Sequence, residues 1–269
     1  LGIKGPIGSA IKVVESSSLK LLKSIGYASN LVKGNFISKI NLDFILEKNL
    51  TLDKIKMSTN GVLKNVAVPQ IALDLDLTMG NLMFKADNDN MMITGNGELL
   101  GVKTEIEWHE NFTNKRPYRR KYRLKAIVNE QNWREKLKLT FPPFNATYTN
   151  GVMGADVTIK VSNDGSGDLK ANLDLKDTLI TLPRLGWYKP ERIEAEALIT
   201  ATFLNDKIVS IPKVVYTGGG LNLTANVSFK SSGVLNQVNI YHLTFGQTDV
   251  QGIMAPRSGS EKKGWNIHV

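Results

Sequence analysis

The chain of 269 residues has no cysteine, only three histidines and few aromatic residues, which make up 7% of the sequence. The absence of cysteine excludes disulfides and thiol chemistry. No segment approaches the roughly 18 consecutive apolar residues that a membrane-spanning helix needs. The sequence opens at Leu1 with neither an initiator methionine nor a signal peptide. We therefore expect an excised piece of a longer chain, with any targeting or anchoring elements outside it.

Patterns that carry catalysis are also scarce. His109, His242 and His268 are far apart, and none lies in the spacing of a zinc motif. The triple glycine at residues 218–220 lacks the lysine and the following helix of a phosphate-binding loop, and no serine lies in a G-x-S-x-G elbow. The sequence predicts no catalytic residues, no metal site and no cofactor. An enzyme on a β-scaffold is the least favoured alternative.

The chain is basic, with 34 Lys and Arg against 25 Asp and Glu and a formal charge of +9. This charge permits attraction to anionic lipid or to nucleic acid but identifies neither. In the densest basic segment, residues 115–123, Tyr118, Arg120 and Tyr122 alternate with three further basic residues. Such spacing fits the solvent side of a strand at least as well as a phosphate track. We predict no nucleic-acid partner.

The chain does contain repeated alternation of apolar and polar residues. Four stretches show it, at residues 40–47, 71–80, 193–203 and 221–229. Alternate side chains of a strand point to opposite faces, so each stretch predicts a strand with one apolar side. Polar turn signals occur at residues 59–61, 87–90, 95–97, 163–167, 205–206, 218–220 and 231–233. From Gly34 onward we predict an antiparallel, mainly β region as a sandwich, barrel or solenoid, which periodicity does not distinguish.

The first 33 residues differ from the rest. Ile7, Ala10 and Ile11 recur at helical spacing, which predicts an amphipathic helix over about residues 6–25. A short second helix is expected near residues 129–136, with Asn129 as its cap. The predicted organisation is a helical segment over residues 1–33 and a β region over residues 34–269.

The apolar strand faces need a cover, because large uncovered apolar patches are unusual in soluble proteins. Acyl chains or the amphipathic helix could supply it. The candidate residues that line such an apolar groove are Leu73, Leu75, Leu77, Ile199, Phe203, Leu223, Val227 and Phe229.

Three segments resemble a known family. Residues 80–112 begin Gly-Asn-Leu-Met-Phe-Lys-Ala-Asp and end Trp-His-Glu-Asn-Phe; residues 182–190 read Leu-Pro-Arg-Leu-Gly-Trp-Tyr-Lys-Pro; residues 243–252 read Leu-Thr-Phe-Gly-Gln-Thr-Asp-Val-Gln-Gly. Together they resemble the C-terminal portion of AsmA-like proteins of the YhdP-like branch. The resemblance covers most of the chain from Gly34 to Val269.

This resemblance implies a long, curved antiparallel sheet that forms a β-groove with an apolar lining. Such relatives are anchored in the inner membrane by an N-terminal helix, extend through the periplasm and are linked to phospholipid traffic and outer membrane biogenesis. The implied function is non-enzymatic lipid transport, with phospholipid acyl chains and other proteins of the cell envelope as partners. The alternative is a structural or assembly module of the bacterial envelope with a self-packed β-sandwich core.

Overall fold

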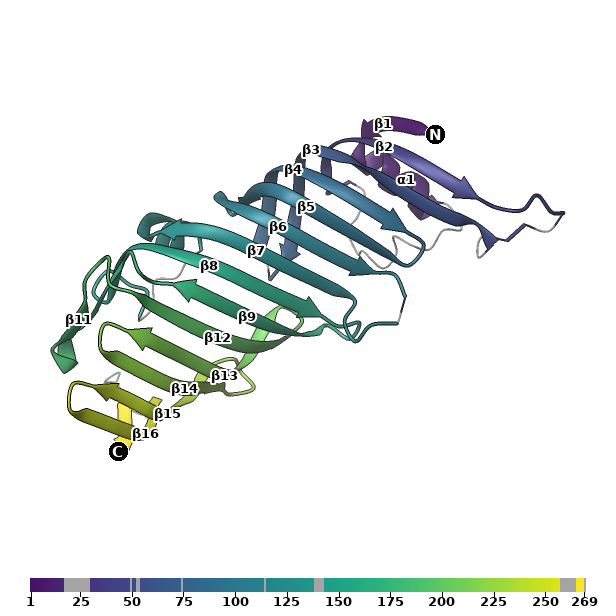
Figure 1. The fold of residues 1–269 in the computed structure, drawn as a ribbon. Coiled ribbons are helices and arrows are strands. Elements are labelled where there is room, and N and C mark those ends of the chain that lie inside the picture. The colour runs from purple at the N-terminus through teal and green to yellow at the C-terminus, as the bar shows by residue number, and fades with distance from the viewer. Residues whose placement is uncertain are drawn as a thin grey trace. The chain divides into compact units, whose positions relative to one another are not determined.

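A computed structural model describes residues 1–16, 30–48, 50–51, 54–73, 75–113, 115–137, 143–256 and 265–268. The strands belong to one open antiparallel sheet of 17 strands, which confirms the predicted mainly β fold (Figure 1). The strands are β1 (Gly2–Pro6), β2 (Lys33–Asp43), β3 (Lys56–Ala72), β4 (Leu75–Asp87), β5 (Asn90–Leu99), β6 (Val102–Asn111), β7 (Arg120–Asn129), β8 (Thr149–Val161), β9 (Ser166–Asp174), β10 (Thr178–Leu182), β11 (Trp187–Lys189), β12 (Ala195–Leu204), β13 (Lys207–Gly218), β14 (Leu221–Phe229), β15 (Leu235–Phe245), β16 (Thr248–Pro256) and β17 (Trp265–His268). The helical elements are α1 (Ile7–Ser16), the π-helix η3 (Asn132–Lys136) and the 3-10 helix η4 (Pro183–Leu185).

The chain divides into two compact units, and the division falls within β7 and β8. Unit 1 comprises Leu1–Leu124 and Lys160–Asn163, and unit 2 comprises Lys125–Ile159 and Asp164–Val269.

Unit 1 is an antiparallel meander with α1 against one face of its first strands (Figure 1). The register places alternate residues of consecutive strands in rows across the sheet. One row runs from Phe36 through Leu63 to Leu82. The row beside it contains Phe84, Ile93 and Trp108. Directly opposed residues share a face of the sheet, so these rows build one apolar surface.

Two of the predicted turns are wrong. Residues 59–61 lie inside β3, and residues 95–97 lie inside β5. A Cβ on Gly61 would be 2.1 Å from the Ile37 carbonyl oxygen and 2.9 Å from the Phe84 ring. Glycine is therefore required here for close approach of neighbouring groups, a strand role that the turn prediction overlooked. The other five turn signals do fall at connections between consecutive strands.

Three alternating stretches were predicted too long. The first extends beyond the end of β2 at Asp43, and Leu46 is 93% exposed. The second is divided at Leu73, which has a φ of 48° in the turn where Ala72 pairs with Leu75. The third begins before β12, which starts at Ala195. In each case the alternation continues into a connection, because side-chain polarity alone does not mark where strand pairing stops.

The helix predictions were partly confirmed. Helix α1 begins at Ile7, one residue after the predicted start, and residues 17–25 of the predicted helix lie outside the described residues. Near residue 130, the Asn129 side-chain oxygen accepts a hydrogen bond from the Asn132 backbone N–H at 2.9 Å, as expected for a cap. The element that follows is a π-helix.

Unit 2 contains a second meander, formed by β9 and β12–β16. Its apolar residues also fall into rows, one of which runs Ala171, Ile199, Val214, Ala225 and Ile240. The β10–β11 hairpin, which contains the Leu-Pro-Arg-Leu-Gly-Trp-Tyr-Lys-Pro segment, pairs with β8.

Candidate functional site

The most distinct site is an apolar cavity in unit 1 between α1 and the sheet. Its volume is about 280 Å³. The lining residues are Ile3, Ile7, Ala10, Ile11, Val32, Phe36, Ser38, Ile40, Met57, Thr59, Leu63, Val66, Val68, Leu77, Leu82, Phe84, Ala86, Asp87, Met91, Ile93, Trp108 and Phe112.

The helical side of the cavity follows from residue spacing. Ile7, Ala10 and Ile11 are three and four residues apart, so they share one side of α1. All three line the cavity, whereas Val13 is 67% exposed. The helix thus covers part of the apolar sheet face.

The sheet side is built by strand alternation. The most enclosed wall residues are Val66, Leu77, Leu82 and Ile93, each no more than 5% exposed. Because these residues stand on the same face as Phe36 and the other row members, the wall is continuous over several strands.

Among the described residues that line the cavity, only Ser38, Thr59 and Asp87 have hydroxyl or carboxylate groups. The Ser38 and Thr59 hydroxyls lie 2.6 Å apart and bond to each other, and the Ser38 hydroxyl also donates to the Asn60 carbonyl. The Asp87 carboxylate accepts hydrogen bonds from the Asp89 and Asn90 backbone N–H groups at 2.8 and 2.9 Å. The wall therefore satisfies its own polar groups and suits a ligand that is itself apolar.

A buried charged network lies beside the wall. Glu110 is fully buried, and its carboxylate accepts a hydrogen bond from Arg120 Nε at 2.6 Å and one from the Trp108 indole N–H at 3.0 Å. The Arg120 guanidinium lies 5.5 Å from the centre of the Trp108 ring. The Tyr122 hydroxyl donates to the Ile71 carbonyl at 2.6 Å. These contacts fix Trp108 in the cavity wall.

The structure places the predicted groove residues at different locations. Leu77 lines the cavity, whereas Leu73 lies in the β3–β4 turn and Leu75 at the start of β4, and neither is part of the lining. The other five, all in unit 2, are Ile199, Phe203, Leu223, Val227 and Phe229. Phe203 is 2% exposed, and the remaining four are half-buried on β12 and β14.

Sequence reasoning missed most of the wall. Phe36, Leu63, Leu82 and Ile93 were not among the candidates, although each is an apolar residue at alternate spacing within its strand. The alternating residues Phe36, Ser38 and Ile40 could have identified this side of the strand, but the predicted alternation began only at Ile40.

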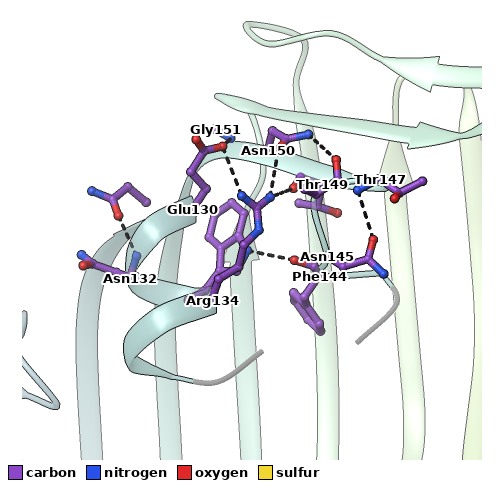
Figure 2. Close-up of polar contacts among 12 residues, drawn as sticks. Glu130, Asn132, Arg134, Phe144, Asn145, Thr147, Thr149, Asn150 and Gly151 are labelled. Atoms are coloured by element: carbon purple, nitrogen blue, oxygen red, sulfur yellow. Dashed lines mark hydrogen bonds and ion pairs between the residues drawn. The ribbon is translucent and has the colours of Figure 1, made fainter. Parts of the chain in front are cut away.

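A second cluster, around Arg134, holds η3 in place in unit 2 (Figure 2). The Arg134 guanidinium donates to the Thr149 carbonyl and to the Asn150 side-chain oxygen. The Gly151 backbone N–H donates to the Glu130 carboxylate at 3.1 Å. Trp133, which is fully buried, donates its indole N–H to the Phe144 carbonyl. These bonds tie a π-helix to the following segment and to β8, so the cluster is structural.

Lys189 is an unusual buried cation in unit 2. It has no exposed surface, and its ammonium donates to the carbonyls of Lys176, Pro190 and Ile193 at 3.0–3.1 Å. Burial lowers the pKa of Lys189, and nearby carboxylates, first that of Asp177, oppose this effect. The side chain therefore bonds the β10–β11 hairpin both to the segment that precedes it and to the loop that follows it.

Tyr216 is the other perturbed buried group. It is 9% exposed, and its hydroxyl has no hydrogen-bond partner among the residues that the structure describes. Burial raises the pKa of Tyr216 to about 12. Its ring packs edge-on against Trp187, with ring centres 6.2 Å apart.

The histidines have ordinary strand environments. His109 contacts Glu107 at 2.7 Å, and His242 contacts Asp249 at 3.5 Å. His268 lies in β17. Within the described ranges, no three His, Asp or Glu side chains are grouped so that they could hold a metal ion. In the same ranges, no helix has the length and apolar character needed to cross a membrane.

No protein-family model, curated protein or solved structure matches the chain. The geometry of the cavity is therefore the main basis for a functional proposal.

Proposed function

We propose that the chain is a non-enzymatic segment of an envelope-spanning protein, which shields and conducts phospholipid acyl chains along an apolar β-groove. The observation that carries this proposal is the cavity of unit 1, with its nearly uniform apolar lining. Transfer of an acyl chain from water to such a surface is favourable in free energy. The acyl chain also has no polar group that the wall would leave unpaired. The volume of about 280 Å³ is close to the lower end of the range for small-molecule sites.

The family resemblance supports the same proposal. Eight lining residues lie in the segment that resembles AsmA-like proteins of the YhdP-like branch: Leu82, Phe84, Ala86, Asp87, Met91, Ile93, Trp108 and Phe112. The proposed periplasmic location, the inner-membrane anchor and the envelope partners rest on this resemblance. A structural or assembly role of the segment is the alternative.

A matched pair of tryptophan substitutions on α1 tests the proposal. Ala10→Trp places a large ring in the cavity, whereas Val13→Trp places the same ring on the exposed side of the helix. Each protein is mixed with vesicles that contain a phospholipid with a fluorescent acyl chain, and lipid that co-purifies from cells is measured by mass spectrometry. We expect lipid uptake by Ala10→Trp to be at least tenfold lower than uptake by the wild type. Uptake by Val13→Trp should equal that of the wild type.

Circular dichroism and thermal melting establish that both variants are folded. Equal lipid uptake by the two variants would place the lipid outside this cavity. A wild-type protein that neither carries nor takes up lipid would favour the structural or assembly role.

A further inference from the structure

Two neighbouring strands of unit 2 carry no formal charge. Charged residues make up 22% of the whole sequence, but β14 and β15 contain no Asp, Glu, Lys or Arg over Leu221–Phe229 and Leu235–Phe245. Since solvent-facing strand positions are where charged residues normally occur, their absence from two adjacent strands needs a reason.

The polar side of these strands is composed of amides, hydroxyls and one imidazole, that of His242, which is paired with Thr224. The register pairs Asn226 with Asn239, Ser228 with Gln237, and Asn222 with Thr244. We call this surface the amide face; its members are Asn222, Thr224, Asn226, Ser228, Gln237, Asn239, Tyr241, His242 and Thr244.

Hydrogen bonds link four members of the amide face into one chain. The Gln237 amide N–H donates to the Asn239 side-chain oxygen at 2.8 Å, and the Asn239 amide N–H donates to the Asn226 side-chain oxygen at 2.8 Å. The Asn226 amide N–H then donates to the Tyr241 hydroxyl. Each carboxamide has two N–H donors and an oxygen with two acceptor sites, so these bonds use only part of its capacity. The side chains are held in place while still able to donate and accept.

Tyr241 adds an aromatic surface to this array. It lies at an irregularity of β15, where the pairing with β14 shifts between Thr224 and Ala225. Such bulges redirect side chains and are frequent beside binding sites. Tyr241 is 53% exposed, and its bond to Asn226 draws the side chain across the neighbouring strand.

We propose that the amide face of β14 and β15 binds a neutral glycan. Sugar hydroxyls both donate and accept hydrogen bonds, which matches carboxamides that offer both functions. The apolar C–H face of a sugar ring is complementary to an exposed tyrosine ring whose hydroxyl is already fixed. Apart from Tyr241, the ionisable group of this face is His242, which is paired with Thr224 and lies 3.5 Å from the Asp249 carboxylate of β16. Neither strand has a lysine or arginine to attract an anionic polymer, which would be drawn to the basic residues elsewhere in the chain. This inference does not depend on the proposed lipid function, which concerns unit 1.

The test uses the whole chain and a panel of neutral hexasaccharides of glucose, mannose and N-acetylglucosamine, with hyaluronan fragments as the acidic comparison. Binding is measured by isothermal titration calorimetry and by the NMR signals of the sugar. We expect at least one neutral hexasaccharide to bind with a Kd of about 1 mM or tighter. Tyr241→Ala and Asn239→Asp should each weaken that binding at least tenfold, and Tyr241→Phe should weaken it less. Tyr188→Ala removes another tyrosine that is 64% exposed and should have no effect.

Several results would overturn the inference. They are no binding by any neutral hexasaccharide at millimolar concentration, equal or stronger binding of hyaluronan fragments, and binding that Asn239→Asp leaves intact. Self-association that these substitutions abolish, seen by sedimentation, would assign the face to a second copy of the chain instead. Because Asn239→Asp preserves side-chain size, it decides the matter even if Tyr241→Ala does not fold.

Discussion

Glu110 and Arg120 form an ion pair at 2.6 Å in which the carboxylate is fully buried and the arginine is 8% exposed. The carboxylate also accepts the Trp108 indole N–H, so the pair supports the cavity wall. Removing one partner of a buried pair leaves an uncompensated charge, whereas replacing both with apolar residues of similar size is often tolerated.

Arg119 Nε also lies 3.5 Å from the Glu110 carboxylate, so Arg120→Met leaves this buried charge with one weaker counter-charge. We therefore expect the free energy of unfolding to fall by about 3 kcal/mol, the lower end for a broken buried pair. The double variant Glu110→Leu with Arg120→Met should recover most of this loss. Urea denaturation provides the measurement. Lys115→Ala, which removes an exposed ion pair with Asp89, is the control and should change stability by less than about 1 kcal/mol. Similar losses in the single and the double variant would show that the pair itself stabilises the unit.

Gly61→Ala should destabilise the protein although it adds only one methyl group. The new Cβ would be 2.1 Å from the Ile37 carbonyl oxygen, which belongs to a paired strand and cannot move aside easily. We expect a loss of about 3 kcal/mol, at the upper end for overpacking. Gly2→Ala is the matched control, since nothing lies within 4 Å of its added Cβ. Equal melting temperatures for the two variants would contradict the close approach at Gly61.

The folded protein should become less stable at strongly alkaline pH because of the ionisation of Tyr216. The pKa of Tyr216 is raised to about 12 in the folded protein, so between its ordinary value and pH 12 the folded chain binds more protons than the unfolded chain. The contribution of Tyr216 to the free energy of unfolding is therefore fully present below pH 10. It falls by on the order of 2 kcal/mol as the pH rises towards 12.

Absorbance titration should reveal one of the seven tyrosines ionising near pH 12, and Tyr216→Phe should remove it. Because no described residue bonds to the Tyr216 hydroxyl, we expect Tyr216→Phe to leave the stability at neutral pH unchanged or slightly raised. A marked destabilisation at pH 7 would indicate that the hydroxyl is hydrogen-bonded in solution.

Lys189→Met should loosen the β10–β11 hairpin. The substitution keeps an apolar stem but leaves three carbonyls without the ammonium that they share, at a cost of about 3 kcal/mol. Limited proteolysis should then cut near residues 183–186 faster than in the wild type. Lys230→Met, at an exposed position, is the control. Unchanged proteolysis in Lys189→Met would mean that pairing with β8 alone holds the hairpin.

Strand alternation was sufficient to predict the mainly β fold, and helical spacing predicted the apolar side of α1, because both follow from short-range periodicity. It identified Leu77 but not Phe36 or Leu82 as cavity residues. Their positions depend on strand register, which shifts between Leu63 and Val66 and again between Thr78 and Asn81. Register is set by pairing across the sheet, so no local pattern contains it.

The sequence did not predict the ion pair of Glu110 and Arg120 for a related reason. Arg120 was correctly placed on the same side of its strand as Tyr122, but its partner Glu110 lies on a different strand. A charged residue at an inward position is interpretable only once its counter-charge is known. Gly61 illustrates a different ambiguity, since Asn-Gly marks both tight turns and close strand contacts.

The meander of unit 1 also has a consequence for synthesis of the chain. Each of β2–β6 pairs with the strand that directly follows or precedes it in sequence. Closing such short hairpins costs little loop entropy, so a nascent sheet can lengthen one strand at a time. The lining residues all precede Thr113, so the ribosome has translated every residue of the wall before it reaches β7. The apolar face therefore needs its cover, from α1 or from a ligand, while the rest of the protein is still being made.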